Sequence, residues 1–542
     1  MRRRFLAAAA FCFAALALLA TTPLAAQQQS TTLSFSPRSL QVDGLLQRGR
    51  QLETERRWGE ALAHYEDGLR LYPEDNNLEQ RFETARLHYD LCRRYADRSY
   101  AASLTHLPTD KALDLYAQVL QKIQTHYVEL PSWRELLERG TADLEVAMGE
   151  SAFATRNMPE RNPVRIDAFR RELHEMLAAR TPATRLDARE TVAAAASLAQ
   201  ARLGVPPTAT VLEYLCGATN SLDPYSAYLT PDQLTEVYSQ IEGNFVGLGV
   251  ELKTSSGTLS IVRVIPGSPA EIAGIRNGDR IVAIDGRAVS DFSTDQAANM
   301  LQGPEGSVVT LAVAAADQPP RQLVVRRQRV EVPSVDQVQM LDPAAGIAYL
   351  KLTCFQKTTH RDLEAALWRL HREKMRTLIM DLRGNPGGLL ISSVEVSDLF
   401  IDHGVIVSTR GRSAQEDFTY TAHEEGTWRV PLTVIIDQDS ASAAEIFSGA
   451  VRDHHRGTVV GVRSFGKGSV QGIFPLEASD AGLRLTTAKF YSPTGRPYSR
   501  VGVEPDIVVH QVARPVNGAV ESKDDAMLAA AVQVARDTVG RR

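Results

Sequence analysis

The chain has 542 residues, of which 44% are hydrophobic, and it contains 60 Lys and Arg residues and 65 Asp and Glu residues. A chain of this length exceeds what one hydrophobic core supports, so three or four domains are expected. The composition excludes a disordered, collagen-like or polytopic membrane protein. The net charge of −5 argues against a nucleic-acid partner.

The first 26 residues have the layout of a secretory signal peptide. Three arginines follow Met1, an apolar run covers residues 5–19, and small residues precede a cleavage position near Ala26. The alternative is an uncleaved membrane anchor, for which the run is short. No later segment has about 18 consecutive apolar residues. We therefore expect an exported protein of the periplasm or cell envelope, with no integral membrane span after signal removal.

The next part of the chain predicts a linker followed by helices. Residues 27–43 are polar and rich in Ser, Thr and Gln, as in a linker. Residues 44–100 form a tetratricopeptide-like helical region, in which the small Gly49 and Ala61 let two helices pack closely. An ordinary helical hairpin is the alternative. Since one repeat cannot bury its own face, these helices are a candidate docking surface for an adaptor or partner protein. Residues 101–239 continue as a helical region that leads into the next domains.

A β-rich domain is predicted at residues 240–330, where β-branched residues alternate between Gly, Pro and Asp turns. Glycines bracket Leu248, and such a loop exposes backbone N–H groups that can donate hydrogen bonds to a peptide carboxylate. The tract 264–286 resembles the PDZ domain. The resemblance implies that Leu248, Gly249 and Val250 bind free protein C-termini. The alternative is a PDZ fold whose groove only packs against the rest of the chain.

Strand and helix patterns alternate from residue 335 to 515, which predicts an α/β core with a substantial sheet. The fold class is therefore multidomain α+β. Residues 516–542 are expected to be a C-terminal tail with a short helix. Within the core, we expect three strands and three helices: strands at 347–352, 377–382 and 432–436, and helices at 360–373, 389–401 and 442–453.

Ser442 and Lys467 are the candidate nucleophile and base. Ser442 follows a buried strand and precedes a helix, whose N–H groups and dipole favour a developing oxyanion. A simple N-cap is the alternative. A lysine acts as a base when it is neutral, and lowering its pKa from about 10.4 to roughly 8 by burial costs about 3 kcal/mol. Gln471 could accept a hydrogen bond from the amine, but the even offset within a strand means that direct contact needs a turn in the backbone.

Other chemistries are disfavoured. Residues 461–467 fit the first part of a nucleotide-binding P-loop, but Gly468 stands where that loop needs Ser or Thr, and a strand pattern follows. The sequence has neither H-E-x-x-H nor G-x-S-x-G. Cys92, Cys216 and Cys354 remain after signal removal, an odd number with wide spacing, so we predict no disulfide framework, no metal and no cofactor.

Five motifs resemble those of the C-terminal processing peptidases, also called tail-specific proteases. They are L-D-P-Y-S-A-Y-L at 222–229, D-L-R-G-N-P-G-G at 381–388, S-A-S-A-A-E at 440–445, S-F-G-K-G-S-V-Q at 464–471 and G-V-E-P-D at 502–506. The resemblance covers roughly residues 110–510 and implies a crotonase-like core and a serine endopeptidase acting on proteins with free C-termini. It also implies a nucleophile, a general base, an orienting partner of that base, and oxyanion-hole N–H groups: Ser442, Lys467, Gln471, and Ala443 with Gly387 or Gly388.

The sequence departs from that family at several positions. Asp437, Asp439, Ala444 and Ser464 stand where Asn, Gly, Ser and Thr are usual, and the two carboxylates would raise the pKa of Lys467 if they lay near it. The tetratricopeptide-like front is outside the usual layout. A non-catalytic PDZ and tetratricopeptide scaffold, or an acyl-CoA enzyme of the crotonase type, are the rival interpretations. The sequence leaves a homo-oligomer open.

Overall fold

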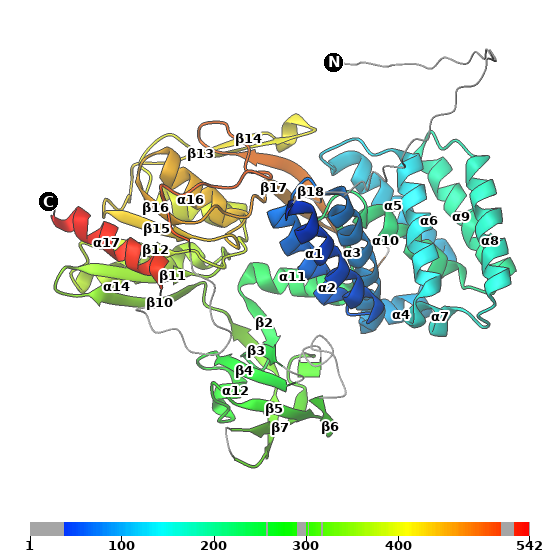
Figure 1. The fold of residues 1–542 in the computed structure, drawn as a ribbon, viewed down its shortest axis with the longest axis horizontal. Helices are drawn as coiled ribbons and strands as arrows, with labels where there is room; N and C mark the ends of the chain where they lie inside the picture. Colours follow the sequence, from blue (N-terminus) through cyan, green and yellow to red (C-terminus); the bar gives the residue numbers. More distant parts are fainter. Residues whose placement is uncertain are drawn as a thin grey trace, which may run out of the picture. The chain divides into compact units, whose positions relative to one another are not determined.

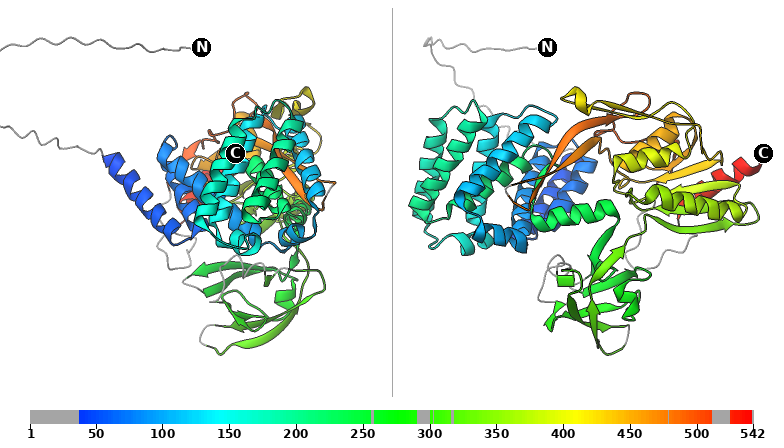
Figure 2. Two further views of the ribbon diagram at one scale, coloured as in Figure 1. Left: turned by 90° about the vertical axis from the view of Figure 1, so that its right-hand side faces the viewer. Right: turned by 180° about the vertical axis from the view of Figure 1, so that it is seen from behind.

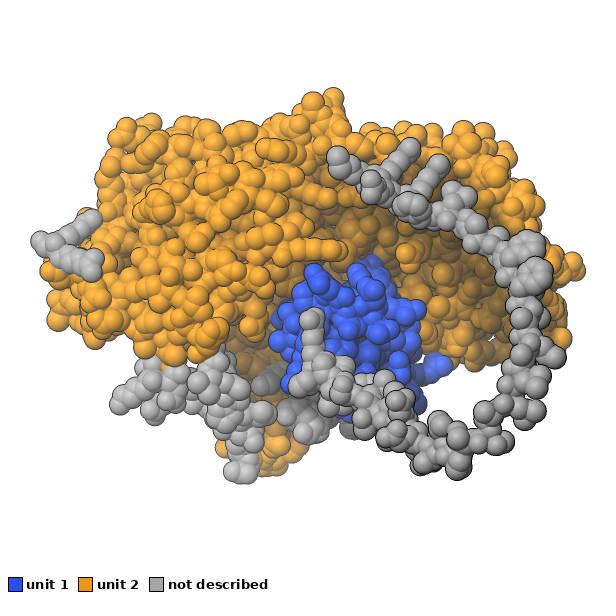
Figure 3. Space-filling model, turned by 45° about the horizontal axis from the view of Figure 1, so that its top comes forward, with its two compact units in different colours: residues 1–86 blue, residues 87–542 orange. Residues whose placement is uncertain are grey.

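The computed structural model describes residues 37–255, 258–289, 300–301, 303–315, 318–477, 479–510 and 525–540. The predicted signal peptide, residues 1–26, and residues 27–36 of the predicted linker lie outside the described residues. The chain divides into two compact units, residues 1–86 and residues 87–542 (Figure 3). No helix in the described ranges combines the length and apolar character that a membrane crossing requires.

The first unit is a helical hairpin with part of a third helix. Its helices are α1 (Pro37–Thr54), α2 (Trp58–Leu71) and the first half of α3 (Asn76–Ala96). A Cβ added to Gly49 of α1 would lie 2.2 Å from the ring of Tyr65 on α2. The Tyr65 ring is fully buried, and its hydroxyl donates to Glu53 at 2.7 Å. The small residue at position 49 therefore lets the two helices approach around one aromatic ring.

Helix α1 begins inside the range predicted as a linker. It starts at Pro37, and proline is favoured at the first helical position because its missing N–H has no intrahelical partner there. Val42 and Leu46, one turn apart, are buried in the same apolar cluster as Tyr65. The boundary predicted at residue 43 was wrong because the polar composition of this stretch hid an apolar helical stripe.

The second unit opens with a helical region, residues 87–242, built around α10. This helix is buried along almost its whole length, and packs against α5, α6 and α9. Gly217 of α10 lies so close to α6 that an added Cβ would be 2.7 Å from the Cα of Gly140. The elements are α4 (Arg98–His106), α5 (Thr109–His126), α6 (Trp133–Gly149), α7 (Ser151–Asn157), α8 (Pro163–Ala178), α9 (Arg185–Leu203), α10 (Pro207–Asn220), β1 (Ala227–Leu229) and α11 (Pro231–Glu242).

The β-rich region, residues 244–331, follows. One sheet has the order β3-β4-β5-β7-β8, with β6 paired to β5, and β2 pairs with β9. Its core is aliphatic, and Leu248, Ile261 and Leu311 are among its buried members. The elements are β2 (Asn244–Gly247), β3 (Val250–Ser255), β4 (Thr258–Val264), α12 (Pro269–Ile272), β5 (Arg280–Ile284), β6 (Arg287–Ala288), β7 (Val308–Ala314), β8 (Arg321–Arg326) and β9 (Gln328–Glu331).

The core region, residues 335–540, contains the sheet β10-β11-β12-β15-β16-β19, which is parallel except for β10 (Figure 1). The alternation predicted from the sequence is confirmed, and two strands have the expected bounds. The elements of this sheet and the helices between its strands are β10 (Val335–Asp342), β11 (Ile347–Leu352), α14 (Thr359–Arg372), β12 (Thr377–Asp381), α15 (Leu390–Asp398), β15 (Leu432–Ile436), α16 (Ala443–Asp453), β16 (Gly457–Gly461) and β19 (Ile507–Val508).

Helices cover both faces of this sheet. Strand residues such as Leu350 and Val434 pack with α14, α15 and α16 on one face. Ile379 and Ile435 face the other way and pack against α17 (Ala526–Gly540), the C-terminal helix drawn in red in Figure 2. The described end of the chain is therefore part of the core region and not a tail, because without α17 the second apolar face of the parallel strands would meet water.

A second sheet joins the core region to the helical region. Its order is β1-β18-β13-β14, with β17 also paired to β18, so β1 of the helical region adds a strand to it. Val128 N–H donates to the carbonyl of Thr486 at 2.9 Å in the same area. The remaining elements are β13 (Val405–Gly411), η2 (Ala414–Glu416), β14 (Phe418–Thr421), β17 (Ser469–Pro475) and β18 (Gly482–Tyr491).

Candidate active site

Ser442 lies at the turn between β15 and α16, immediately before the first helical residue. Its backbone has φ 56° and ψ −114°, a conformation that costs a non-glycine residue energy. Its N–H donates to Oε2 of Glu445 at 2.7 Å. The surrounding bonds thus hold the serine in a strained turn at the N-terminus of a helix, where backbone donors are available.

The Glu445 carboxylate binds the serine turn and the lysine loop at once. Oε2 accepts the N–H of Ser442 at 2.7 Å and the N–H of Lys467 at 2.9 Å. Oε1 accepts the Ser464 hydroxyl at 2.6 Å and the N–H of Gly466 at 2.7 Å. Burial raises the pKa of Glu445, and these four bonds oppose the rise. Since all four partners donate, the geometry suits an ionised carboxylate.

Lys467 has the environment of a lysine that is easily deprotonated. Burial and the positive charge of Arg484 together lower its pKa to about 8, while Glu445 and Asp223 act in the opposite direction. The ammonium nitrogen lies 4.8 Å from the centroid of the Tyr225 ring. A pKa near 8 leaves about a tenth of the side chains neutral at pH 7, enough for a general base.

The turn beside Lys467 comes from the helical region. Asp223 Oδ1 accepts the N–H groups of Tyr225 and Ser226 at 2.7 and 2.9 Å, and Oδ2 accepts the Ser226 hydroxyl at 2.7 Å. Ser226 Oγ in turn accepts the N–H of Thr486 on β18 at 3.1 Å. Arg484 Nε donates to the Tyr225 carbonyl at 2.8 Å. The turn is thus fixed internally by one carboxylate and externally by two residues of β18.

Gln471 lies on β17, just after a register shift between positions 470 and 471 in the pairing with β18. Its amide nitrogen donates to the carbonyl and the hydroxyl of Ser469 at 3.0 and 2.8 Å. Lys467 itself precedes β17. The simple strand geometry assumed from the sequence does not apply, because a bulge redirects the side chains around it.

A glycine loop abuts the serine turn. A Cβ added to Gly387 would lie 2.7 Å from Cβ of Ser442 and 2.9 Å from the nitrogen of Ala443. One added to Gly388 would lie 2.0 Å from the carbonyl oxygen of Phe355. Gly387 N–H donates to Asn385 Oδ1 at 2.8 Å. Of the two glycine N–H groups considered from the sequence, the Gly387 group is therefore occupied by Asn385, which leaves the Gly388 group as the better candidate for an oxyanion donor.

The two additional carboxylates do not act on the lysine as the sequence suggested they might. Asp437 Oδ1 accepts the N–H groups of Gly384 and Asp439 and the hydroxyl of Ser440, at 3.0 to 3.1 Å. The carboxylates that raise the pKa of Lys467 are Glu445 and Asp223. Asp437 instead ties the serine turn to the glycine loop.

Sequence reasoning missed the residues around the base. Glu445 and the 223–226 turn lie inside motifs that the sequence analysis singled out, but nothing local indicated that they meet Lys467. Arg484 lies in a strand pattern with no motif signal at all. The one available signal was the Glu at the third helical position after Ser442, which fits a capping box and so has an ordinary structural explanation.

The predicted peptide-binding loop lies between β2 and β3 of the β-rich region. Gly249 has φ 82° and a Cβ there would lie 2.2 Å from Ser268, so only glycine fits. Leu248 is buried, its carbonyl accepts the N–H of Ala270 at 2.9 Å, and that of Gly249 accepts the N–H of Ile265 at 2.9 Å. These bonds fix the loop that leads into Val250 at the start of β3.

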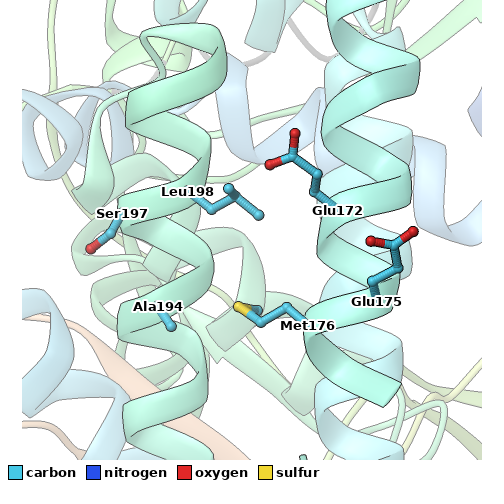
Figure 4. Close-up of a pocket in the computed structure, with 6 residues that line it drawn as sticks. All are labelled: Glu172, Glu175, Met176, Ala194, Ser197 and Leu198. Atoms are coloured by element: carbon cyan, nitrogen blue, oxygen red, sulfur yellow. The ribbon is translucent and has the colours of Figure 1, made fainter. Parts of the chain in front are cut away.

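Other candidate sites lack a reactive group. A hollow of about 610 Å³ lies between α8 and α9, where Leu198 and Met176 project from opposite helices into the gap, near Glu172 and Glu175 (Figure 4). Its one hydroxyl, Ser197, donates to a helix carbonyl at 2.9 Å.

Burial raises the pKa values of the Cys216 and Cys354 thiols, so neither is activated. Among the described residues, no group of three or more His, Cys, Asp and Glu side chains is placed to hold a metal.

Comparison with known proteins finds two families and several relatives. The profile of peptidase family S41 matches residues 346–509, and that of the PDZ domain matches residues 260–314. A carboxy-terminal-processing protease of Bartonella bacilliformis is 38% identical over 302 residues, 54% of this chain and 68% of that protein. A carboxyl-terminal-processing protease of Synechocystis sp. is 33% identical over 293 residues, 53% of this chain and 68% of that protein. A solved photosystem II D1 C-terminal processing protease is 25% identical, with a TM-score of 0.40, covering 73% of this chain and 93% of that one.

Proposed function

Since the chain belongs to peptidase family S41, with the carboxy-terminal-processing proteases, we propose that it is an exported serine endopeptidase that recognises protein C-termini and cleaves through a Ser442/Lys467 dyad. The observation that carries the proposal is the bridging carboxylate of Glu445, which accepts N–H groups of both residues at 2.7 and 2.9 Å. It supports the dyad because one buried group sets the position of both backbone segments.

The proposed reaction is acyl transfer. Neutral Lys467 takes the proton of the Ser442 hydroxyl as the oxygen attacks the scissile carbonyl, and the lysine then protonates the leaving amine. Water hydrolyses the resulting ester, with Lys467 again as base. The pKa of about 8 supports this role, because a general base works best when its pKa lies near the pH at which the enzyme operates.

The N–H groups of Ala443 and Gly388 are the proposed oxyanion hole, with Gly387 keeping the loop tight against Ser442. Ala443 is the first residue of α16, so its N–H has no intrahelical acceptor. Gly387 is held by Asn385, whose amide nitrogen also donates to the carbonyl of Leu352 at 2.8 Å. A pre-positioned loop of this kind lowers the barrier without reorganising during the reaction.

Gln471 is proposed to orient the lysine. Its amide nitrogen is used by Ser469, and an amide bound in this way still offers its oxygen to the amine of Lys467. The bulge next to Gln471 supports the role, because it removes the strict alternation of a regular strand.

Leu248, Gly249 and Val250 are proposed to bind the substrate's free C-terminus. The positive φ of Gly249 turns the backbone in the way that anion-binding nests require. An extended peptide would then add to the edge of the PDZ sheet by β-augmentation. Protein substrates with free C-termini are the expected partners.

The remaining assignments rest on the sequence and the fold together. We propose a crotonase-like core, to which α17 contributes, and a tetratricopeptide-like front that docks an adaptor or partner protein. The N-terminal arginines and apolar run support export to the periplasm or cell envelope. Whether a homo-oligomer forms is answered by light scattering of the purified chain.

Recognition of C-termini is tested with a pair of unfolded polypeptides that differ only at the last residue, one with a free carboxylate and one with a C-terminal amide. Wild type should cleave the free form faster, and a chain lacking residues 244–328 should cleave both equally. Ser448→Ala is the matched control, because that hydroxyl only donates to a carbonyl within α16. A non-catalytic scaffold would cleave neither polypeptide, and equal rates on both by wild type would refute C-terminal recognition.

A further inference from the structure

Two cations converge on the Tyr225 turn. The Lys467 ammonium lies over the face of the Tyr225 ring, 4.8 Å from its centroid, and the Arg484 guanidinium donates to the carbonyl of the same residue at 2.8 Å. The segments that carry them are neighbours in the sheet, since Lys467 lies two residues before β17 and β17 pairs with β18, the strand of Arg484. Like charges on the same turn disfavour each other, and the lysine is the one that can lose its proton.

Arg484 lies on β18 and is held between two neighbouring strands. It lies opposite Ile473 of β17 and Ala227 of β1, in the middle of the second sheet. The Tyr225 carbonyl that it binds belongs to a turn whose N–H groups are fixed by Asp223. A guanidinium stays charged at every pH of interest, so a charge fixed in this way is permanent.

We propose that Arg484 is a positioning residue for the base: its guanidinium, anchored on the Tyr225 carbonyl, places a permanent positive charge beside Lys467 and favours the neutral amine. The inference rests on the proposed function of Lys467. It also explains why the turn at 223–226 belongs to the active site, since that turn holds both cations.

The other charged groups around Lys467 and Arg484 act on the protonation of Lys467 in different directions. Glu445 and Asp223 favour the protonated lysine, whereas burial and Arg484 oppose it. Around Arg484 itself, Asp223 and Asp90 are the nearby carboxylates and Arg93 is a further cation. Asp223 faces both cations, so neutralising it should act on the lysine in the direction opposite to neutralising Arg484.

The test measures the protonation of Lys467 directly. Cyanate reacts with neutral amines, so the rate of carbamylation of Lys467, followed by peptide mass spectrometry against pH, reports its titration. The measurement is made in full-length Ser442→Ala, so it does not depend on cleavage. Arg484→Gln removes the charge and keeps an N–H donor for the Tyr225 carbonyl, and Arg484→Lys keeps the charge. Lys489→Met is the matched control, since it removes a charge from the same strand where the side chain pairs with Glu129.

We expect the titration midpoint of Lys467, read from its carbamylation, to rise by at least about half a pH unit in Arg484→Gln. This is a threefold or greater loss of labelling at pH 7. Arg484→Lys should restore the wild-type midpoint, Lys489→Met should not move it, and Asp223→Asn should lower it. With Ser442 present, the acid limb of kcat/KM should move with the midpoint.

An unchanged midpoint in Arg484→Gln, or an equal shift in Lys489→Met, would overturn the inference. If Arg484→Gln does not fold, as judged by its urea midpoint, Arg484→Lys is compared with Asp223→Asn instead. A lower titration midpoint of Lys467 in Asp223→Asn alone supports the account, and an unchanged titration midpoint in Asp223→Asn refutes it. Failure of the proposed function looks different, because cleavage would then survive in Ser442→Ala and Lys467→Ala.

Discussion

Replacing Glu445 with Gln tests how the dyad is assembled. The carboxylate accepts four hydrogen bonds and is fully buried. A glutamine has one acceptor oxygen, so its NH₂ group must face either the Ser442 and Lys467 pair or the Ser464 and Gly466 pair. Two donors are then buried without an acceptor, at about 1 to 3 kcal/mol each. The free energy of unfolding should therefore fall by about 2 to 6 kcal/mol.

The same change should slow the reaction. Displacing the serine turn from the lysine loop by about 1 Å costs about 100-fold in kcat, with a smaller effect on KM. Urea unfolding gives the stability, and cleavage of a fluorogenic peptide gives kcat and KM. Asp187→Asn is the control, because that carboxylate caps α9 through two N–H groups away from the site and should lose stability without losing kcat. The reasoning fails if Glu445→Gln keeps both its unfolding free energy within about 1 kcal/mol and its kcat within about threefold.

Three further changes follow from the geometry. Gly388→Ala should lower kcat by about 100- to 1,000-fold, since the added Cβ would lie 2.0 Å from a backbone oxygen and would displace an oxyanion donor. Gly149→Ala is the control, because nothing lies within 4 Å of a Cβ added there. An unchanged kcat in Gly388→Ala would contradict the assignment. Lys467 holds its proton to a higher pH in the unfolded chain than in the folded one. The free energy of unfolding of wild type, relative to that of Lys467→Met, should therefore rise by up to about 3 kcal/mol between about pH 8 and pH 10. Parallel pH profiles of the two proteins would show that the pKa of Lys467 is not lowered. Ala531→Asp should unfold the core region by burying a charge under α17, whereas Ala529→Asp on the exposed face should not, and equal urea midpoints would contradict the packing of α17.

The buried strands of the core could be predicted from the sequence, because a buried strand is a short run of apolar residues. The strands at 347–352 and 432–436 are short apolar runs with turn residues at their ends, and both have the predicted bounds. Helix α17 shows the limit of this reasoning. Its Ala and Val residues predict a helix, but only the tertiary structure shows that Met527 and Ala531 close the second face of the parallel sheet.

The environment of the site depended on contacts between distant segments. Lys467 was identified by its glycine neighbours, and a lowered pKa was expected from burial alone. The turn that carries Tyr225 is separated from Arg484 by 259 positions, and no local pattern encodes such a contact. The register shift before Gln471 likewise arises from pairing with β18, which a single strand pattern does not reveal.

The most direct test of the account is a timed digest of an unfolded protein with an apolar C-terminus, read by intact mass, with wild type, Ser442→Ala and Lys467→Ala. The account predicts that wild type alone removes C-terminal fragments and that both variants, folded as judged by their urea midpoints, leave the substrate whole. Cleavage that persists in either folded variant would contradict the dyad, and the absence of cleavage by wild type with any substrate C-terminus would contradict the peptidase.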